Sequence, residues 1–307
     1  MKTRPFGNTG LHASEVGLGC ASYWGKQHFS EAKALRVVRQ ALDSGITYFD
    51  TGHSYSGGNA EPRLGKALQG TPTDKLLISS KAGTRLGNRG KLYKDFSPHW
   101  LRHSVEQSVK HLGLERLPVL LLHGPVCTDF TDELATCMAA MKTAGLIGHA
   151  GVNSFDDDVL ELALQTPWAD AVMLDYHLLK PERGPLIQRW HEAGRAVIAG
   201  NALGGGMYHP KNWLPVSPRR AWYLARAMKN HRENLIRGLH CRYISHQPNM
   251  TAAQIAMRYV LNNGAVSTTA FGTTRAEHVK EVALASRQSL DSDLATRLAQ
   301  TQRRFQA

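Results

Sequence analysis

Residues 46–81 read ITYFDTGHSYSGGNAEPRLGKALQGTPTDKLLISSK, and the fold prediction begins from this stretch. A short run rich in β-branched and aromatic side chains, Ile46–Asp50, comes first. A segment with helical spacing follows, and then a second apolar run, Leu76–Ser80. A strand, a helix and another strand in this order are typical of a βα unit, in which the strands lie parallel. The stretch therefore indicates a parallel sheet covered by helices.

The same alternation recurs along the whole chain. Eight runs are candidate strands: Glu15–Gly19, Ile46–Asp50, Leu76–Ser80, Val119–Leu122, Ile147–Val152, Ala171–Asp175, Arg195–Ala199 and Ser267–Phe271. A closed barrel needs eight successive βα units, whereas a doubly wound open sheet rarely uses so many. We therefore predict an α/β fold, a (β/α)8 TIM barrel. Residues 1–307 are expected to form a single domain, because no low-complexity linker or composition change divides the chain.

Local signals predict elements around this barrel. The segment Arg4–Ser14, with Gly7-Asn8-Thr9-Gly10 in its middle, indicates an N-terminal β-hairpin that plugs the barrel bottom. Ser30 and the pair Ser97-Pro98 are expected to begin helices, since serine caps helix N-termini and proline suits the first helical position. Thr274-x-x-Glu277 predicts a capping box for the helix that follows the eighth strand.

Composition limits the classes of function. The net charge is +12, from 37 basic and 25 acidic residues, but the basic residues are spread along the chain rather than gathered in a stripe or tail. This distribution argues against nucleic-acid binding. No apolar run is long enough to cross a membrane, and no secretory signal is evident, so a cytoplasmic location is expected. Four cysteines without pairing logic are expected to be free thiols: Cys20, Cys127, Cys137 and Cys241.

Four polar residues are predicted to meet at one rim of the barrel. Asp50, Lys81 and His123 follow the second, third and fourth strands, and Tyr55 lies in the loop above the second. In TIM barrels the chemistry occurs at the C-terminal ends of the strands. Each residue alone could be a helix cap, a solvated lysine or a core histidine. Their convergence indicates a catalytic site.

The four residue types suit the reduction of a carbonyl, which needs a hydride on carbon and a proton on oxygen. A free phenol has a pKa near ~10 and transfers protons poorly at neutral pH. An ammonium group beside it, Lys81, is expected to lower the pKa of Tyr55, with Asp50 holding the lysine in place. His123 is expected to orient the carbonyl through a hydrogen bond. Tyr55 is therefore the predicted general acid and base.

Motifs along the chain resemble those of the aldo-keto reductase family. They are RPFGNTGL (residues 4–11), YFDTGHSY (48–55), EPRLGKAL (61–68), ISSK (78–81), LGL (112–114), LLHGP (121–125), GVNSF (151–155) and FGTT (271–274). The match runs in order through essentially the whole chain, and in that family Asp50, Tyr55, Lys81 and His123 occupy the catalytic positions. The lead-in at Asp95-Phe96-Ser97 is similar to the branch that includes aldose, galactose and fucose 1-dehydrogenases.

The resemblance implies an extended NADP(H) cofactor and a small carbonyl or sugar substrate. No Gly-x-Gly-x-x-Gly motif follows the first strand, so a Rossmann site is not expected. Phosphates should meet backbone N–H groups after the seventh strand and at the helix after the eighth. The candidates are Leu203, Gly204, Gly205, Gly206, Gly272, Thr273 and Thr274. Arg275 could pair with a 2′-phosphate, which favours NADP over NAD.

Several positions depart from the family pattern. Asn153-Ser154 replaces Ser-Asn at the place that holds the nicotinamide amide, and Met173 replaces a glutamine. Gly200 stands where an aromatic ring usually stacks on the nicotinamide, and Val282 where an asparagine usually meets the adenine. Losing these partners is expected to weaken cofactor binding. Tyr176 or Tyr208 could supply a substitute ring.

Substrate contacts are expected from the loops above the barrel. These loops are Ala21–Gln27, Thr84–Lys94, Cys127–Phe130 and Met207–Arg220, and Trp24 is a candidate pocket wall or a packing residue. Two other functions remain compatible with the residues: proton transfer in an isomerase or lyase, and a non-catalytic regulatory subunit. No metal site is predicted, because His99 and His103 lie four residues apart without a third ligand. The sequence leaves the oligomeric state open.

Overall fold

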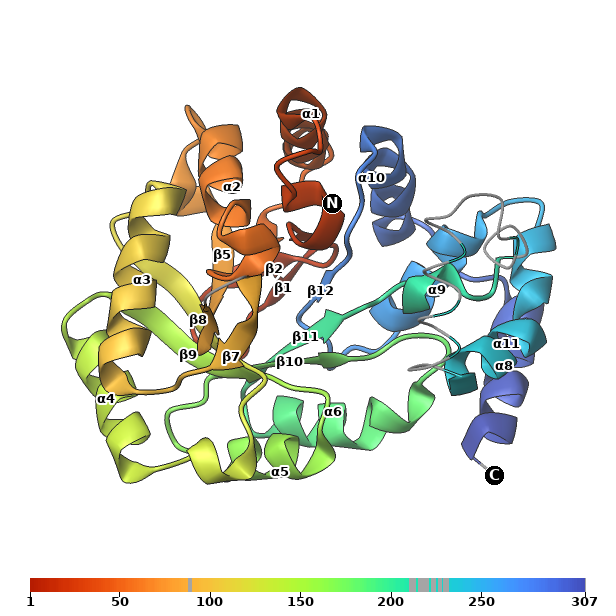
Figure 1. Ribbon diagram of the computed structural model, residues 1–307. Coiled ribbons are helices and arrows are strands. Elements are labelled where there is room, and N and C mark those ends of the chain that lie inside the picture. The colour runs from red at the N-terminus through yellow and green to blue at the C-terminus, as the bar shows by residue number, and fades with distance from the viewer. Residues whose placement is uncertain are drawn as a thin grey trace.

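The computed structural model describes residues 1–87, 90–209 and 232–306, together with residues 214, 221, 225 and 228. Eight parallel strands form one sheet that closes into a barrel, and helices surround it (Figure 1). The strands are β3 (Leu18–Gly19), β4 (Tyr48–Asp50), β5 (Leu77–Ala82), β8 (Leu117–His123), β9 (Ile147–Asn153), β10 (Ala171–Asp175), β11 (Ala196–Gly200) and β12 (Thr268–Ala270). All eight predicted strands are present, and the (β/α)8 barrel is confirmed.

Closure of the barrel occurs between the first and last of these strands. The sheet order is β12-β11-β10-β9-β8-β5-β4-β3, so each strand lies beside its neighbour in sequence. A single parallel bridge, Leu18 to Phe271, joins the two ends. Backbone hydrogen bonds support it, from Gly19 N to Phe271 O at 2.8 Å and from Phe271 N to Gly17 O at 3.1 Å. The seam of the barrel is therefore short.

Helices follow the strands on the outside of the barrel. They are α1 (Glu31–Asp43), α2 (Ala60–Leu68), α3 (Pro98–Leu112), α4 (Asp132–Thr143), α5 (Asp157–Gln165), α6 (Gly184–Glu192), α8 (Arg232–His240), α9 (Ala252–Leu261), α10 (Ala276–Ala283) and α11 (Ser292–Gln306). Helices α8, α9 and α11 group at one side, near the C-terminus (Figure 1). Within the described ranges, none of the helices combines the length and apolar character needed to cross a bilayer.

Helix starts test the capping predictions. The Ser30 side chain accepts a hydrogen bond from Lys33 N, and Ser97 accepts one from Trp100 N, so both caps are confirmed. The capping box at Thr274 is wrong, because α10 begins one residue later, with Arg275 at the N-cap and no side-chain cap bond. A hydroxyl acceptor at position 274 cannot cap a helix that starts beyond it.

The N-terminal hairpin closes the barrel bottom, as predicted. Strand β1 (Thr3–Pro5) pairs antiparallel with β2 (His12–Ser14), and the Phe6 side chain is fully buried among inward-facing strand residues. Arg4 fastens the hairpin to the end of the chain. Its guanidinium donates to the carbonyls of Leu261, Asn263 and Val266, at 2.5, 2.9 and 2.8 Å.

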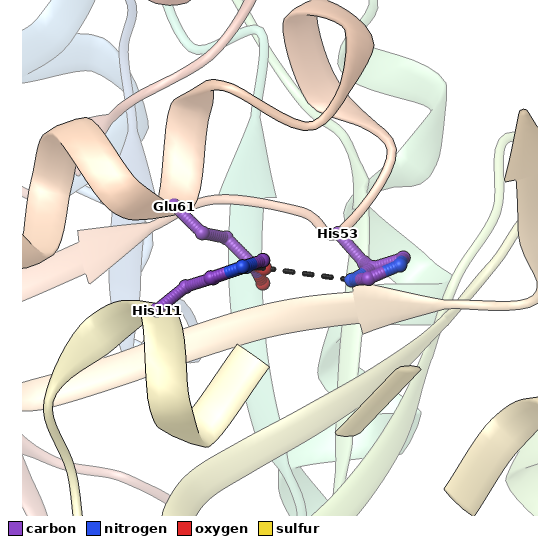
Figure 2. Close-up of side chains that lie close together, drawn as sticks. All are labelled: His53, Glu61 and His111. Carbon is purple, nitrogen blue, oxygen red and sulfur yellow. Dashed lines mark ion pairs between the residues drawn. The ribbon is translucent and has the colours of Figure 1, made fainter. Parts of the chain in front are cut away.

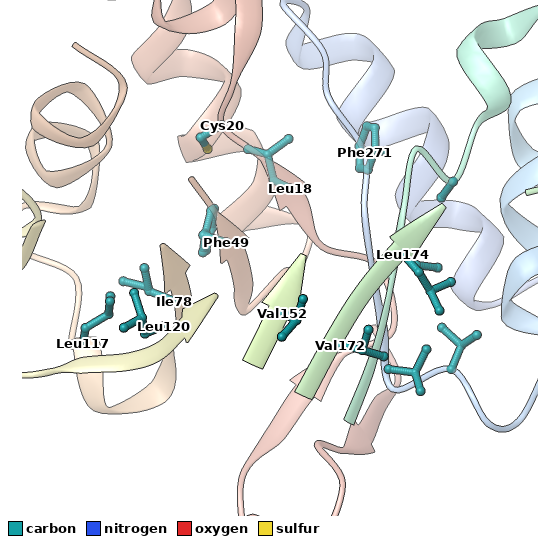
Figure 3. Close-up of a cluster of buried hydrophobic side chains, with 14 of the residues drawn as sticks. Leu18, Cys20, Phe49, Ile78, Leu117, Leu120, Val152, Val172, Leu174 and Phe271 are labelled. Carbon is teal, nitrogen blue, oxygen red and sulfur yellow. The ribbon is translucent and has the colours of Figure 1, made fainter. Parts of the chain in front are cut away.

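Alternation along the strands sorts the core into two layers. Tyr48, Leu77 and Met173 point inward and pack around Phe6, whereas their neighbours point outward against the helices. Figure 3 shows the outer layer, including Leu18, Phe49, Ile78, Leu120, Val152, Val172 and Leu174. A period of two is what a barrel wall covered on both faces requires. The inner layer fills the barrel below the rim, so a site must lie above it.

Two further connections are relevant to the site. After β5, a hairpin of β6 (Thr84–Leu86) and β7 (Leu92–Lys94) pairs antiparallel before α3 begins. The loop Met207–Arg220, expected to contact substrate, lies mostly outside the described residues.

Candidate active site

Parallel strands bring the four predicted catalytic residues to the same rim. Asp50 is the last residue of β4, His123 is the last of β8, and Lys81 stands one residue before the end of β5. Tyr55 begins a short 3-10 turn, η2 (Tyr55–Gly57), that follows β4. Backbone bonds hold this loop against β5, since Thr51 N donates to Ser79 O and His53 N donates to Lys81 O. The structure thus brings all four side chains together.

A buried ion pair forms the base of the site. Lys81 Nζ donates to Asp50 Oδ1 at 2.5 Å and to the Thr51 carbonyl at 2.9 Å, and both side chains are almost fully buried. Burial is the largest single influence and would lower the pKa of Lys81, but attraction to Asp50 and Tyr55 together outweighs it, so the pKa is raised. Lys81 is therefore a fixed positive charge. Ser79 Oγ donates to the same Asp50 oxygen at 2.7 Å and holds the carboxylate in place.

Tyr55 lies above this charge, but its acidity differs from the prediction. The Lys81 ammonium nitrogen is 5.0 Å from the centre of the phenol ring. Burial raises the pKa of Tyr55 more than the Lys81 charge and hydrogen bond lower it, so the pKa lies above the usual value. Lys81 acts on the pKa of Tyr55 in the predicted direction, but the net pKa is higher than that of a free phenol, because desolvation was not visible in the sequence. Tyr55 is protonated at neutral pH.

His123 stands beside the phenol and is uncharged. The two rings are perpendicular, with centroids 5.3 Å apart. Burial, followed by repulsion from Lys81 and Lys94, lowers the pKa of His123 to about 3. An imidazole that stays neutral carries one N–H and one acceptor nitrogen. Its chemistry therefore depends on which nitrogen holds the proton.

The hairpin β6–β7 determines that choice. Lys94 Nζ lies 3.1 Å from Thr84 Oγ1 and also contacts the His123 carbonyl oxygen, and Thr84 Oγ1 lies 3.0 Å from His123 Nδ1. An ammonium can only donate, so the Thr84 hydroxyl accepts from Lys94, and its own hydrogen is available for His123. We infer from this network that Nδ1 is the acceptor and Nε2 carries the proton. Sequence reasoning missed this role of Thr84 and Lys94, because the loop Thr84–Lys94 was assigned only to substrate contact.

A cleft of about 890 Å³ opens beside this rim, above the ends of β11 and β12. The predicted phosphate-binding residues that line it are Leu203, Gly205, Gly206, Gly272, Thr273 and Arg275. Sequence reasoning missed a further wall, formed by residues 247–254 at the start of α9. The helix N-termini of α9 and α10 both border the cleft. Unpaired N–H groups at helix N-termini attract anionic groups.

The glycine turn after β11 has a backbone that favours glycine. Gly204, Gly205 and Gly206 all have positive φ, at 53, 63 and 68°. Side chains other than glycine rarely adopt this region. Arg275 lines the cleft from the N-cap of α10 and is exposed. Thr274 lies beside it but does not line the cleft.

Asn153 and Ser154 lie at the end of β9 on the same rim. The Asn153 amide nitrogen donates to the Met173 carbonyl at 3.3 Å, and Ser154 Oγ accepts from Asp156 N at 3.2 Å. Both side chains are buried and already engaged. Beside them, a Cβ added to Gly200 would lie 3.4 Å from Met173 Cγ. Gly200 and Met173, two of the departures from the family pattern, are therefore neighbours.

The candidate aromatic residues are packed inside the protein. The Trp24 side chain is 1% exposed, and its indole nitrogen donates to the Ala34 carbonyl at 3.2 Å. Trp24 therefore packs η1 (Ser22–Gly25) against α1 instead of forming a wall of the site. Tyr176 is buried against Tyr259, with hydroxyls 3.2 Å apart. Tyr208 is 3% exposed beside the cleft.

Comparisons with known proteins agree with this geometry. The sequence profile described as the aldo/keto reductase family matches residues 15–303. The chain belongs to the aldo/keto reductase family. Among its relatives, it is 26% identical over 288 residues to the uncharacterised oxidoreductase YqkF of Bacillus subtilis (strain 168), covering 92% of this chain and 90% of that protein. It is 28% identical over 224 residues to a D-threo-aldose 1-dehydrogenase of a Pseudomonas species, covering 64% and 68% of the two chains.

A solved structure has the same fold. The holo form of aldo-keto reductase AKR11C1 from Bacillus halodurans superposes with a TM-score of 0.79 at 24% identity, covering 98% of this chain and 96% of that one. As an aldo/keto reductase, the chain is an oxidoreductase. Members of the family use nicotinamide cofactors and act on small carbonyl or sugar substrates.

Proposed function

We propose that this aldo/keto reductase transfers hydride between NADP(H) and a small carbonyl compound or sugar, with Tyr55 as general acid and base. One observation carries the proposal. A fixed cation, Lys81, lies under a protonated phenol, Tyr55, which stands beside a neutral imidazole, His123. A proton donor, a charge that stabilises its anion and a hydrogen-bond donor for oxygen are the groups that carbonyl reduction needs.

When bound, the nicotinamide supplies or accepts the hydride at carbon. The protein moves the proton. Tyr55 gives its hydroxyl hydrogen to the carbonyl oxygen as negative charge develops there, and the Lys81 ammonium stabilises the tyrosinate that remains. His123 donates its Nε2 hydrogen to the same oxygen and orients it. In the oxidation direction, tyrosinate takes the proton back from the alcohol.

The raised pKa of Tyr55 favours the reductive direction at neutral pH. Burial keeps the phenol protonated until a substrate oxygen becomes basic enough to accept its hydrogen. Oxidation requires tyrosinate at the start, so alkaline pH should accelerate it more than reduction. The ratio of the two initial rates, measured across the pH range, should rise with pH. A ratio that is independent of pH would argue against proton transfer through Tyr55.

The cleft supports the proposal that a dinucleotide binds beside this site. Its helix N-termini suit phosphate groups, and Arg275 is an exposed cation that lines it. A 2′-phosphate distinguishes NADP from NAD, so Arg275→Leu should weaken NADPH binding and leave NADH binding unchanged. The loss should be about tenfold, which is the usual effect of removing an exposed charge-assisted hydrogen bond. Lys280→Leu, an exposed cation on the same helix, is the control and should change neither. Equal losses for both cofactors would contradict the assignment to the 2′-phosphate.

Titration of the purified protein with NADPH, followed by nicotinamide fluorescence, tests cofactor binding directly. Turnover is then measured with a panel of aldehydes and aldoses. Tyr55→Phe should lower kcat by about 10²–10⁴-fold, the usual contribution of general acid catalysis, while NADPH still binds. Tyr243→Phe, a half-buried tyrosine in the short helix η9 (Arg242–His246) that does not line the cleft, should have no effect. Full activity in Tyr55→Phe, or turnover by cofactor-free protein, would overturn the proposal.

A further inference from the structure

A cluster of potential ligands lies behind the candidate active site, on a face that the proposed reaction does not use. His53 comes from the loop after β4, Glu61 from the first turn of α2, and His111 from the last turn of α3. Figure 2 shows both imidazoles pointing at the same carboxylate from opposite elements. Sequence reasoning missed the cluster, because 58 residues separate its first and last members.

The three facing atoms lie close together but make no hydrogen bond. Glu61 Oε2 lies 3.6 Å from His53 Nδ1 and 3.5 Å from His111 Nδ1, and all three atoms lie within 4.8 Å of one another. These distances exceed those of good N–H···O hydrogen bonds. Each of the three atoms is buried without a hydrogen-bond partner. Three unpaired polar atoms facing one point need an explanation, because buried polar groups are nearly always satisfied.

The carboxylate at the centre is fully buried. Glu61 is 0% exposed, and its other oxygen, Oε1, accepts from Ser80 Oγ at 2.5 Å. A fully buried anion needs a positive partner.

A single protonated histidine would satisfy this arrangement poorly. An imidazolium would approach Oε2 to hydrogen-bond distance and leave the second imidazole nitrogen unpaired. The two nitrogens instead stand at nearly equal distances from the same oxygen. A metal ion satisfies all three atoms at once. Tetrahedral zinc, with bonds of about 2.0–2.1 Å to imidazole and carboxylate, separates its ligand atoms by roughly 3.4 Å.

We propose that His53 Nδ1, Glu61 Oε2 and His111 Nδ1 bind one divalent first-row transition-metal ion, for which Zn²⁺ is the best match. Two imidazoles and one carboxylate are a zinc-type ligand set, and a fourth position is left for water. The side chains of His53 and His111 are 17% and 33% exposed, which gives the ion a route from solvent.

The ion would brace the loop that carries Tyr55. His53 stands two residues before Tyr55, and its backbone nitrogen already donates to the Lys81 carbonyl at 3.1 Å. Binding at His53 joins this loop to α2 and α3 through a single centre. The role is structural, since it fixes the loop without contact between the ion and the reacting groups.

Zinc binding to the full-length protein tests the proposal independently of activity. Protein stripped with a chelator is titrated with Zn²⁺ in competition with an indicator of micromolar zinc affinity, and the melting temperature is followed in parallel. We expect one equivalent to bind and the melting temperature to rise. Loss of a residue that only hydrogen-bonds to a metal ligand lowers metal affinity by about 10–100-fold. His111→Asn and His53→Asn each remove a ligand itself, so each should lower zinc affinity by more than this.

Two further variants keep the outcome unambiguous. The double variant His99→Asn, His103→Asn removes two exposed histidines from the same helix, α3, and should bind zinc like the wild type. Glu61→Gln retains the side-chain shape and should lose the ion. If Glu61→Gln does not fold, the two histidine variants still decide. A wild-type protein that fails to compete with the indicator overturns the proposal, as does loss of binding in the His99, His103 variant alone.

Discussion

Replacing Thr84 with valine tests how the site sets the proton on His123. Valine has nearly the shape of threonine but no hydroxyl, so the substitution removes the hydrogen that we infer Thr84 gives to Nδ1 at 3.0 Å, together with the acceptor for Lys94 at 3.1 Å. The imidazole is then free to hold its proton on either nitrogen. In the Nδ1–H form, Nε2 has no hydrogen to give to the substrate oxygen. We therefore expect slower turnover in Thr84→Val with the fold intact.

The size of the effect follows from the bond that is lost. Loss of one neutral hydrogen bond costs about 0.5–1.5 kcal/mol, and about 1.4 kcal/mol corresponds to a factor of ten. The value of kcat/KM should therefore fall by about 2- to 12-fold. An interaction made mainly in the transition state lowers kcat and kcat/KM together. NADPH affinity should not change, because Thr84 does not line the cleft.

Steady-state kinetics with one carbonyl substrate, alongside the ring ¹⁵N shifts of His123, measures both consequences. Thr84→Ser is the control, since it keeps the hydroxyl and should keep the rate. A Thr84→Ser enzyme as slow as Thr84→Val would show that packing, not the hydroxyl, matters. Nitrogen shifts that place the proton on Nδ1 in the wild type would refute the reasoning outright.

Three other predictions concern the cofactor shelf and stability. Gly200→Tyr should restore a stacking ring worth about 0.5–1.5 kcal/mol and tighten NADPH binding by about 2- to 12-fold in fluorescence titrations, whereas Gly200→Ala should not. Gly83→Ala should cost about 1–3 kcal/mol in urea unfolding, because φ is +93° and its Cβ would lie 2.0 Å from the Phe96 ring; Gly70→Ala, strained but unobstructed, should cost less. In the folded protein the pKa of His123 is about 3, whereas in the unfolded chain the imidazole takes a proton below pH ~6.5. The free energy of unfolding should therefore fall as the pH is lowered from ~6.5 to about 3. In His123→Gln, the free energy of unfolding should fall less over the same pH range.

The fold was predictable from the sequence because periodicity reports burial directly. Strands such as Ala171–Asp175 are buried on both faces, which produces the apolar runs on which the prediction rested. The first and last residues of the strands and helices were less predictable. Only Leu18–Gly19 of the first predicted strand pairs as a strand, since the ends of an element depend on its tertiary contacts as well as on local composition. The start of α10 differs from the prediction by one residue.

The site was predictable in its positions but not in its electrostatics. Strand ends specify where Asp50, Lys81 and His123 lie, and a motif adds Tyr55. The pKa of Tyr55 depends on how much of the barrel covers it, which no local pattern encodes. The same limit hid Lys94, whose contact with the His123 carbonyl joins residues 29 apart. Catalytic roles for these residues stay predictions until the variants above are measured.

The seam between Leu18 and Phe271 has a consequence for how the chain is synthesised. A ribosome releases β3 early and β12 only when most of the chain has emerged, so β3 spends nearly all of translation as an exposed edge. The hairpin waits equally long, because Arg4 needs carbonyls near residue 263. Contacts between such distant residues form late and slowly. We expect nascent chains halted before residue 261 to remain open, protease-sensitive sheets, and to become resistant once the last strand is released.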